Sequence, residues 1–259
     1  MKVCCVQFNP VWLDEEANLV QLTALFKANV EHDKPDVVVL PELFHSGFSM
    51  DTQAISQTRC GAVYQCLSRL AKTYSLTLIA GVALKGETHH KQEPPVFNTA
   101  LVFDPEGNEQ ACYIKNHSFS YSGEHHHYQQ DNKQVVFTIN GTSCSVFICY
   151  DLRFPELFRQ VAKQVEVVFV IANWPDSRQQ HWQTLLQARA IENQCLVVGV
   201  NRIGEDGNGL SYQGGSSIIS PLGETLAYMD ADSNYLVTEV DPKQTQQVRT
   251  RFPFLNDMK

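Results

Sequence analysis

The sequence alternates between short apolar runs and segments with helical spacing, and this alternation restricts its fold more than any other feature. Residues 36–42 (DVVVLPE) form a β-branched run closed by a proline, which is typical of a strand buried on both faces. Residues 14–32 carry leucines at helical spacing, and Asp14 can cap the start of that helix. Strands that alternate with helices favour an α/β fold with parallel strand pairs.

The same pattern predicts most of the remaining elements. Further strands are expected at residues 3–8, 76–84, 143–151, 165–173, 195–201 and 235–240, and further helices at residues 60–74, 154–164 and 178–193. Residues 98–115 and 214–229 indicate hairpins, because turn residues interrupt both segments. Hairpins pair antiparallel, so mixed sheets are expected. About twelve strands are too many for one open sheet, which favours a four-layer α-β-β-α sandwich of two mixed sheets.

Composition supports one globular unit. Apolar residues make up 43% of the chain and charged residues 19%, unlike a disordered protein. No linker rich in proline, glycine or serine divides the chain, and we expect a single domain over residues 1–259. The tail that begins at Pro242 is polar, contains a late aromatic pair, and is expected to be extended.

The net charge and the cysteine spacing restrict the cellular location and the binding partners that can be expected for the chain. The formal net charge is −8, which disfavours binding to nucleic-acid phosphates or to an anionic membrane surface. No apolar stretch approaches the ~20 residues that a membrane-spanning helix needs. Gln7 and Asn9 interrupt the first apolar run, so it indicates a strand and not a signal peptide. The eight cysteines match neither a disulfide framework nor a zinc site, and a reducing, cytoplasmic location is expected.

Three reactive side chains each follow an apolar run, at the strand ends where sheets of this kind bind ligands. Cys149 stands where a strand turns into a helix, near N–H groups that favour a thiolate; the alternative is a buried core cysteine. Glu42 could act as a general base or could cap or pair structurally. Lys115 could stabilise an oxyanion or reach toward solvent.

Together, these segments resemble the nitrilase-type carbon–nitrogen hydrolases. PELF (41–44), YIKNHSF (113–119) with GEHHHY (123–128), and CYDLRFPE (149–156) match their signature segments in the order Glu, Lys, Cys. ANWP (172–175) together with CYDLRFPE is most similar to the omega-amidase branch, which hydrolyses omega-monoamides of small dicarboxylic keto acids. Two departures lie near the expected pocket rim. Ser118 stands where leucine is usual, and QQDN follows Tyr128 where a glycine is common.

The resemblance implies a mechanism and its residues. Glu42 takes the thiol proton of Cys149, and the thiolate attacks the amide carbonyl. Lys115 and the backbone N–H of Tyr150 hold the oxyanion, a thioester forms as ammonia leaves, and Glu42 then activates water. Glu124 matches a second family glutamate that holds Lys115. The resemblance implies no cofactor and no metal, a small-molecule amide substrate of the 2-oxoglutaramate or 2-oxosuccinamate type, and a homodimer in which RFPF (251–254) could reach across.

The residues that would bind the substrate are less specific. Arg153 could meet a substrate carboxylate, or could form an ion pair with Asp151, Glu156 or another acid. Trp174 and Tyr121 are candidates for the pocket wall, although such aromatics are more often core. A further pair, Arg189 and Glu192, lies three residues apart on a helix and indicates a structural ion pair.

Other functions remain open on the sequence alone. A nitrilase or a carbamoylase could use the same three residues, and a non-catalytic α/β binding module could keep the fold. The run His125-His126-His127 suggests a metallohydrolase, but consecutive histidines in an extended segment point to opposite sides. A solvated loop is therefore the favoured interpretation of that run.

Overall fold

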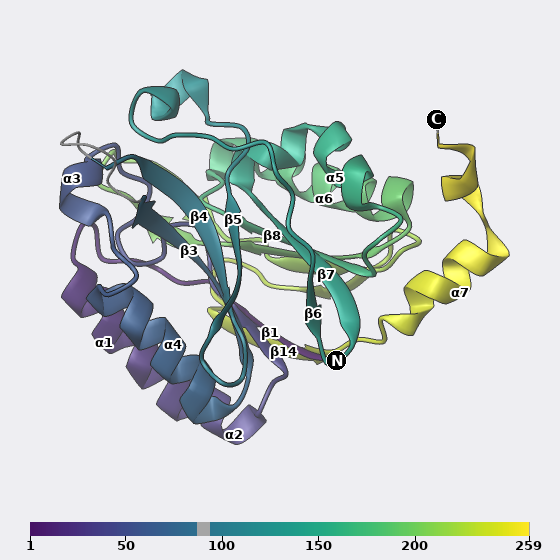
Figure 1. The fold of residues 1–259 in the computed structure, drawn as a ribbon, viewed down its shortest axis with the longest axis horizontal. Coiled ribbons are helices and arrows are strands. Elements are labelled where there is room, and N and C mark those ends of the chain that lie inside the picture. The colour runs from purple at the N-terminus through teal and green to yellow at the C-terminus, as the bar shows by residue number, and fades with distance from the viewer. Residues whose placement is uncertain (87–93, 259) are drawn as a thin grey trace.

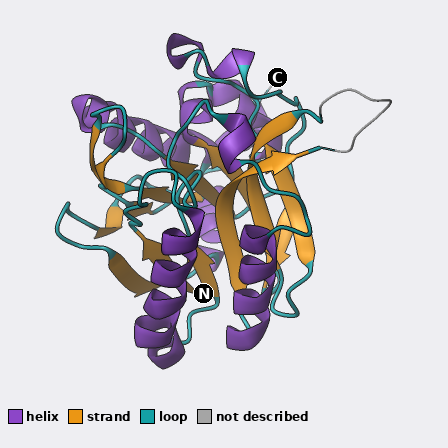
Figure 2. Cartoon of the chain, turned by 90° about the vertical axis from the view of Figure 1, so that its left-hand side faces the viewer, coloured by secondary structure: helices purple, strands orange, loops and turns teal. Residues whose placement is uncertain are grey.

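Two mixed sheets pack face to face between layers of helices in the computed structural model, which describes residues 1–86 and 94–258 (Figures 1 and 2). The predicted four-layer sandwich is thus confirmed. The first sheet has the order β14 (Tyr235–Glu239), β1 (Lys2–Val6), β2 (Val37–Val39), β3 (Thr77–Lys85), β4 (Val96–Phe103), β5 (Glu109–Ile114). The second has the order β13 (Thr225–Tyr228), β12 (Ser217–Ile219), β9 (Leu196–Asn201), β8 (Val167–Ala172), β7 (Thr142–Ile148), β6 (Phe137–Ile139).

Both sheets combine parallel centres with antiparallel edges, as the mixture of βα units and hairpins predicts. β1 pairs parallel with β2, and β2 with β3, whereas the hairpin strands β4 and β5 pair antiparallel. β7, β8 and β9 are parallel, and the hairpin of β12 and β13 joins them antiparallel. A separate two-stranded ribbon is formed by β10 (Ile203–Glu205) and β11 (Ser211–Gln213). Side chains at the carboxyl ends of the parallel strands therefore meet at one end of the sandwich.

The helices cover the outer faces. α1 (Glu15–Leu25) and α4 (Ala62–Tyr74) pack on the first sheet, and α5 (Pro155–Val161) and α6 (Gln179–Asn193) pack on the second. A π-helical turn, η1 (Phe26–Val30), and the short helix α2 (Glu31–Asp33) continue α1. One further short helix, α3 (Thr52–Ile55), follows β2. In the described part of the chain no helix is both long and apolar enough to cross a bilayer.

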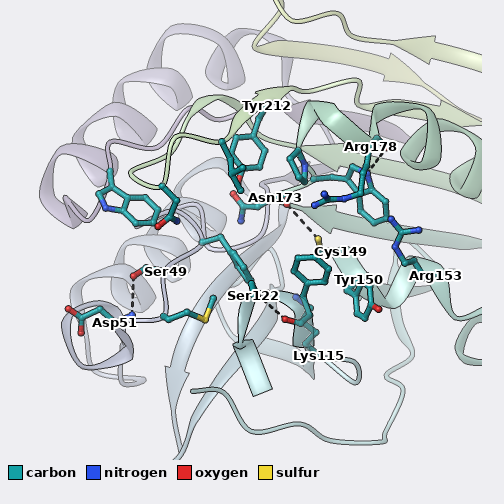
Figure 3. Close-up of a pocket in the computed structure, with 18 residues that line it drawn as sticks. Ser49, Asp51, Lys115, Ser122, Cys149, Tyr150, Arg153, Asn173, Arg178 and Tyr212 are labelled. Carbon is teal, nitrogen blue, oxygen red and sulfur yellow. Dashed lines mark hydrogen bonds between the residues drawn. The ribbon is translucent and has the colours of Figure 1, made fainter. Parts of the chain in front are cut away.

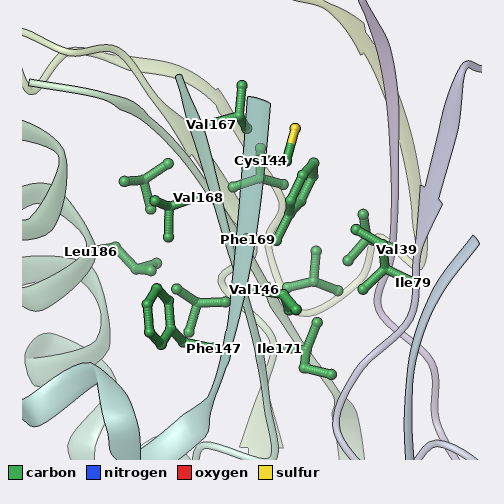
Figure 4. Packing of buried hydrophobic residues seen from close by; sticks show 14 of the residues in the cluster. Val39, Ile79, Cys144, Val146, Phe147, Val167, Val168, Phe169, Ile171 and Leu186 are labelled. Atoms are coloured by element: carbon green, nitrogen blue, oxygen red, sulfur yellow. The ribbon is translucent and has the colours of Figure 1, made fainter. Parts of the chain in front are cut away.

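Side chains alternate across the strands of the second sheet, as the twofold period of a strand requires (Figure 4). Val146 and Phe169 point toward Val39 of the first sheet, whereas Phe147 points toward Leu186 of helix α6. One buried cluster thus joins both sheets and the outer helices. Strands buried on both faces explain the continuous apolar runs in the sequence.

The tail differs from its expected extended conformation. Lys243–Arg251 forms helix α7, followed by a 3-10 turn, η6 (Phe254–Asp257), beside the sandwich (Figure 1). Arg249 donates hydrogen bonds to the main-chain oxygens of Gln194, Asn193 and Val165, between 2.9 and 3.1 Å. The segment has no apolar stripe that would indicate a helix in the sequence, so the expected extended conformation is wrong. Good helix formers and hydrogen bonds to the second sheet's loops stabilise this helix instead.

Candidate active site

The segment that carries Glu42 is held against the neighbouring strand by close backbone contact. A Cβ atom at Gly81 of β3 would lie 2.4 Å from the Glu42 Cα and 2.6 Å from the Leu43 nitrogen. Glycine is therefore needed at this position. The Gly81 N–H donates to the Pro41 oxygen at 3.1 Å, and the Phe44 N–H donates to the Gly81 oxygen at 3.3 Å. These contacts turn the fully buried Glu42 side chain into the space between the sheets.

Cys149 stands at the predicted strand-to-helix elbow. It follows β7 directly, begins the 3-10 turn η4 (Cys149–Arg153), and adopts a left-handed conformation with φ of 47°. Asp151 secures this turn, since its carboxylate accepts hydrogen bonds from the Ile148 N–H, the His117 N–H and the Tyr113 hydroxyl, at 2.8 to 3.1 Å. A non-glycine residue in this region is strained, and such strain persists where surrounding contacts impose it.

A buried lysine joins two glutamates. Lys115 follows β5, and its Nζ lies 2.8 Å from Glu42 Oε1 and 2.9 Å from both carboxylate oxygens of Glu124. Burial works against the lysine charge, but the carboxylates of Glu124 and Glu42 outweigh it and raise the pKa of Lys115 well above its usual value. Lys115 is therefore a permanent cation in this site.

Asn173, at the end of β8, connects the glutamate to the cysteine. Its N–H donates to Glu42 Oε2 at 2.9 Å, and its side-chain amide donates to the Glu42 main-chain oxygen at 2.7 Å. Its own carbonyl oxygen lies 3.7 Å from Cys149 Sγ. The ANWP segment contributes to the family resemblance, but no role for this asparagine is predicted from the sequence.

The ionisation of Cys149 departs from the sequence-based expectation. Burial, together with the Glu42 carboxylate, raises the pKa of the Cys149 thiol well above its usual value, although Lys115 opposes the shift. The expected stabilisation of a thiolate by the helix start is thus outweighed, because a buried anion beside a carboxylate is disfavoured. The resting side chain is a thiol.

A cavity of about 460 Å³ lies over Cys149 and Lys115 (Figure 3). This volume falls in the range of sites for small molecules. Its wall is largely aromatic, and it includes Trp12, Phe48, Phe119, Tyr150, Trp174 and Tyr212.

Two arginines line one side of this cavity (Figure 3). The Arg153 guanidinium lies 4.8 Å from the centre of the Trp174 ring, and that of Arg178 lies 5.6 Å from the centre of the Phe119 ring. Within residues 1–86 and 94–258, neither arginine forms a salt bridge. The predicted alternative, an ion pair of Arg153 with Asp151, Glu156 or another acid, is therefore wrong for Asp151, for Glu156 and for every other acid in those ranges. Arg178 was missed by sequence reasoning, because nothing in its segment distinguishes it from a surface arginine.

The other candidates divide between the cavity and the surface. Trp174 lines the cavity and is 3% exposed, but Tyr121 is 89% exposed and lies outside the wall. The prediction for Tyr121 is wrong because the 3-10 turn η2 (Ser120–Ser122) turns it outward, and Phe119 takes the expected place. The predicted structural pair is confirmed, since Arg189 Nη1 lies 2.8 Å from Glu192 Oε1.

The histidine run lies on the surface. His125 and His126 belong to a 3-10 turn, η3 (Glu124–His126), and not to an extended segment, and all three histidines are exposed. In the part of the chain that the structure describes, no group of three or more His, Cys, Asp or Glu side chains could hold a metal ion. All eight cysteines, which lie in that same part, are free.

Comparisons with known proteins agree with this geometry. The family model described as carbon-nitrogen hydrolase matches residues 2–250. The chain is 35% identical to the omega-amidase YafV of Escherichia coli (strain K12) over 258 residues, which cover 99% of this chain and 96% of that protein. It is 31% identical to the 2-oxoglutaramate amidase of Bacillus subtilis (strain 168) over 260 residues, which cover 99% and 97%.

Solved structures show the same fold. The CN-hydrolase superfamily protein XC1258 of Xanthomonas campestris superimposes with a TM-score of 0.91 at 31% identity, covering 100% of this chain and 97% of that one. Its crystal structure holds an arsenic adduct in the active site. Nit3 of Saccharomyces cerevisiae, a member of the nitrilase superfamily, superimposes with a TM-score of 0.85 at 24% identity, covering 98% and 94%.

Proposed function

The chain belongs to the carbon–nitrogen hydrolase family, and on that premise we propose that it cleaves omega-monoamides of small dicarboxylic 2-oxo acids to the acid and ammonia. One observation carries the proposal: the same cavity is lined by the Cys149 thiol, the Lys115 ammonium and two arginines that have no acidic partner among the described residues. The names of the relatives, omega-amidase and 2-oxoglutaramate amidase, support the same substrate class.

The first half of the proposed reaction forms a thioester. Glu42 accepts the Cys149 proton as Sγ attacks the amide carbonyl, because the raised pKa of the thiol leaves little thiolate beforehand. The Lys115 ammonium and the Tyr150 N–H stabilise the oxyanion, the latter as one of the free N–H groups at the start of η4. Glu42 returns the proton to the amide nitrogen, the carbon–nitrogen bond breaks, and ammonia leaves.

In the second half of the proposed reaction, water hydrolyses the thioester. Water takes the place of ammonia, Glu42 accepts one of its protons, and the hydroxide oxygen attacks the thioester carbonyl. The carbon–sulfur bond breaks, and the proton on Glu42 returns to Cys149 Sγ. The dicarboxylic acid is released, and the enzyme regains its starting state. Glu124 keeps Lys115 in place throughout, through its two contacts at 2.9 Å.

The carboxylate of the substrate is assigned to Arg153 and Arg178. An omega-monoamide carries its carboxylate at the end opposite the amide, and guanidinium groups bind carboxylates through paired hydrogen bonds. Both arginines line the same cavity as Cys149, whose thiol meets the amide carbon (Figure 3). Because the whole chain has a net charge of −8, attraction of an acid depends on such local cations.

Ammonia release tests the proposal. Wild type and Cys149→Ala are compared on small omega-amides with and without a 2-oxo group, and on matched nitriles and carbamoyl compounds. Rapid release from the 2-oxo omega-amides by wild type alone is expected. Turnover of a nitrile or a carbamoyl compound with none of any omega-amide would identify a nitrilase or a carbamoylase instead. Full activity of Cys149→Ala would rule out the cysteine mechanism.

We also propose a cytoplasmic homodimer. A reducing compartment keeps the Cys149 thiol competent for catalysis. Residues 251–254 join helix α7 to the turn η6 in the tail beside the sandwich, where they could contact a second copy (Figure 1). Sedimentation at micromolar protein is expected to give the mass of a dimer, and a stable, active monomer would refute this assembly.

A further inference from the structure

One side-chain amide lies between the two buried glutamates of the site. Asn98, on β4, is 1% exposed, and its Nδ2 donates to Glu42 Oε1 at 2.7 Å and to Glu124 Oε1 at 2.9 Å. The same two oxygens contact Lys115 Nζ, at 2.8 and 2.9 Å. Each of these carboxylate oxygens therefore has two donors, one from the lysine and one from the asparagine.

We propose that Asn98 is a positioning residue that holds Glu42 and Glu124 around Lys115 by donating one hydrogen bond to each carboxylate. This role rests on the proposed function, in which Glu42 is the base. A single lysine charge faces two carboxylate charges at this point, so one negative charge of the cluster is not balanced by the lysine. Hydrogen bonds donated to a carboxylate favour its charged form. The two hydrogens of one amide nitrogen can serve both carboxylates at once.

The same contacts orient Glu42 toward the nucleophile. With Oε1 held by Lys115 and Asn98, Glu42 Oε2 accepts the Asn173 N–H at 2.9 Å. Asn173 also contacts Cys149 Sγ through its carbonyl oxygen. Rotation of the Glu42 carboxylate would break contacts on both of its oxygens, so the base has one orientation relative to the thiol.

The other end of the amide argues against a merely structural role. Asn98 Oδ1 is buried and has no hydrogen-bond partner in the described residues. An unpaired buried acceptor lowers stability. An apolar side chain would avoid that loss, so the benefit of an asparagine lies in its two donors. The reverse orientation of the amide would place Oδ1 against two carboxylates.

Paired variants on β4 test this role. Asn98→Leu removes both donors, Asn98→Asp keeps the shape but adds a negative charge, and Thr99→Val is the control. Thr99 is the next residue on the strand, fully buried, and its hydroxyl donates to the Val82 oxygen, away from the glutamates.

Besides Lys115, the titratable groups whose charges interact with those of the two glutamates are Cys149 and Tyr128.

The pH profile of kcat/KM gives the main readout. We expect the acid limb of Asn98→Leu to move to higher pH, because a carboxylate that has lost a hydrogen-bond donor takes up a proton more readily. The kcat of this variant at neutral pH is expected to fall by about 10- to 100-fold. Asn98→Asp should lose at least as much, whereas Thr99→Val should keep the wild-type limb. The proposal would be overturned if the acid limb of kcat/KM in both Asn98 variants lay where it lies in the wild type. It would also be overturned if Thr99→Val shifted the limb equally.

A measurement without substrate separates this proposal from the proposed function. The rate at which iodoacetamide alkylates Cys149, followed by mass spectrometry of its peptide, is measured against pH for the same variants. The curve of alkylation rate against pH is expected to move to higher pH in folded Asn98→Leu or, if that variant does not fold, in Asn98→Asp. Overlapping curves would count against Asn98. If wild type cleaves no amide but the curves separate, the proposed substrate is wrong and the role of Asn98 stands.

Discussion

At Cys149, burial and a neighbouring carboxylate shift the pKa of the thiol in one direction, and a neighbouring ammonium group shifts it in the other. Desolvation and the Glu42 carboxylate raise its pKa, and the nearby Lys115 lowers it without cancelling the shift. A thiol in this state is oxidised more slowly than a thiolate, since the thiolate is the reactive form. Reactivity then depends on a substrate carbonyl being present while Glu42 accepts the proton. The base is therefore as important to the reaction as the nucleophile.

This ionisation predicts a particular pH behaviour of the free enzyme. A raised pKa means that Cys149 carries less thiolate at neutral pH than a free cysteine does, and gains it only as pH rises well above the usual thiol range. The difference in thiolate ultraviolet absorbance between wild type and Cys149→Ala should therefore stay flat from about pH 6 to 8. The same titration of Cys60→Ala is the control, because it shows how much of the absorbance change comes from the exposed cysteine. A titration step below neutral pH would contradict the prediction.

The two cavity arginines predict selectivity by charge. Arg153→Gln and Arg178→Gln should each lower kcat/KM for an anionic omega-amide by about 10- to 100-fold, because a charge-assisted contact is lost. Neutral amides of the same length should be cleaved at nearly the wild-type rate by these variants. Arg159→Gln is the matched control, since Arg159 donates to the Glu192 main-chain oxygen on α6 and does not line the cavity. Equal losses on anionic and neutral amides would indicate a structural role.

Among the elements, the β2–β3 pair decides where the base lies. Pro41 ends the apolar run, Leu43 adopts a φ of 44°, and the chain turns there across Gly81 of β3. The apolar pattern of β2 and its proline are visible in the sequence. The need for a glycine on the facing strand is not, because it depends on the distance between two backbones.

Gly81→Ala should therefore impair catalysis by displacing the segment that carries Glu42. Its Cβ would overlap the Glu42 backbone, and the displaced base should lower kcat by at least about 10-fold, with a stability loss of about 1–3 kcal/mol. Ala80→Gly on the same strand provides the control. That change should cost about 1 kcal/mol of unfolding free energy and leave kcat unchanged. Wild-type kcat in a folded Gly81→Ala protein would show that the close approach does not position Glu42.

For the whole molecule, the site exists only when both sheets are packed together. Glu42 and Lys115 follow strands of the first sheet, whereas Cys149 and Asn173 follow strands of the second. Strand β14, near the end of the chain, pairs with β1 at its start, from Lys2 opposite Glu239 to Val6 opposite Tyr235. One buried cluster spans both sheets. We therefore propose that the chain folds as a single domain.

A single domain predicts one cooperative unfolding transition. Loss of helical circular dichroism, of tryptophan fluorescence and of activity should coincide in urea. Val146→Ala, at the contact between the sheets, should move all three curves together by about 1–3 kcal/mol. A plateau in which one signal is lost while another persists would mean that the two sheets unfold separately.

The sequence by itself determined the elements and the reactive side chains. Apolar runs, helical spacing and turn residues depend on neighbours along the chain, so they predicted two mixed sheets and placed Glu42, Lys115 and Cys149 at strand ends. The resemblance to the carbon–nitrogen hydrolases added Glu124, and the structure brings these four residues together through Lys115 and Asn173.

Only the tertiary structure decided the properties that depend on packing. It turned Tyr121 outward, placed Arg178 beside Arg153, and made the tail a helix. It also reversed the expected direction of the Cys149 pKa. The physical reason is that desolvation and charge pairing act between residues that are distant in sequence. Their sign is therefore set by the packing of the two sheets and not by spacing along the chain.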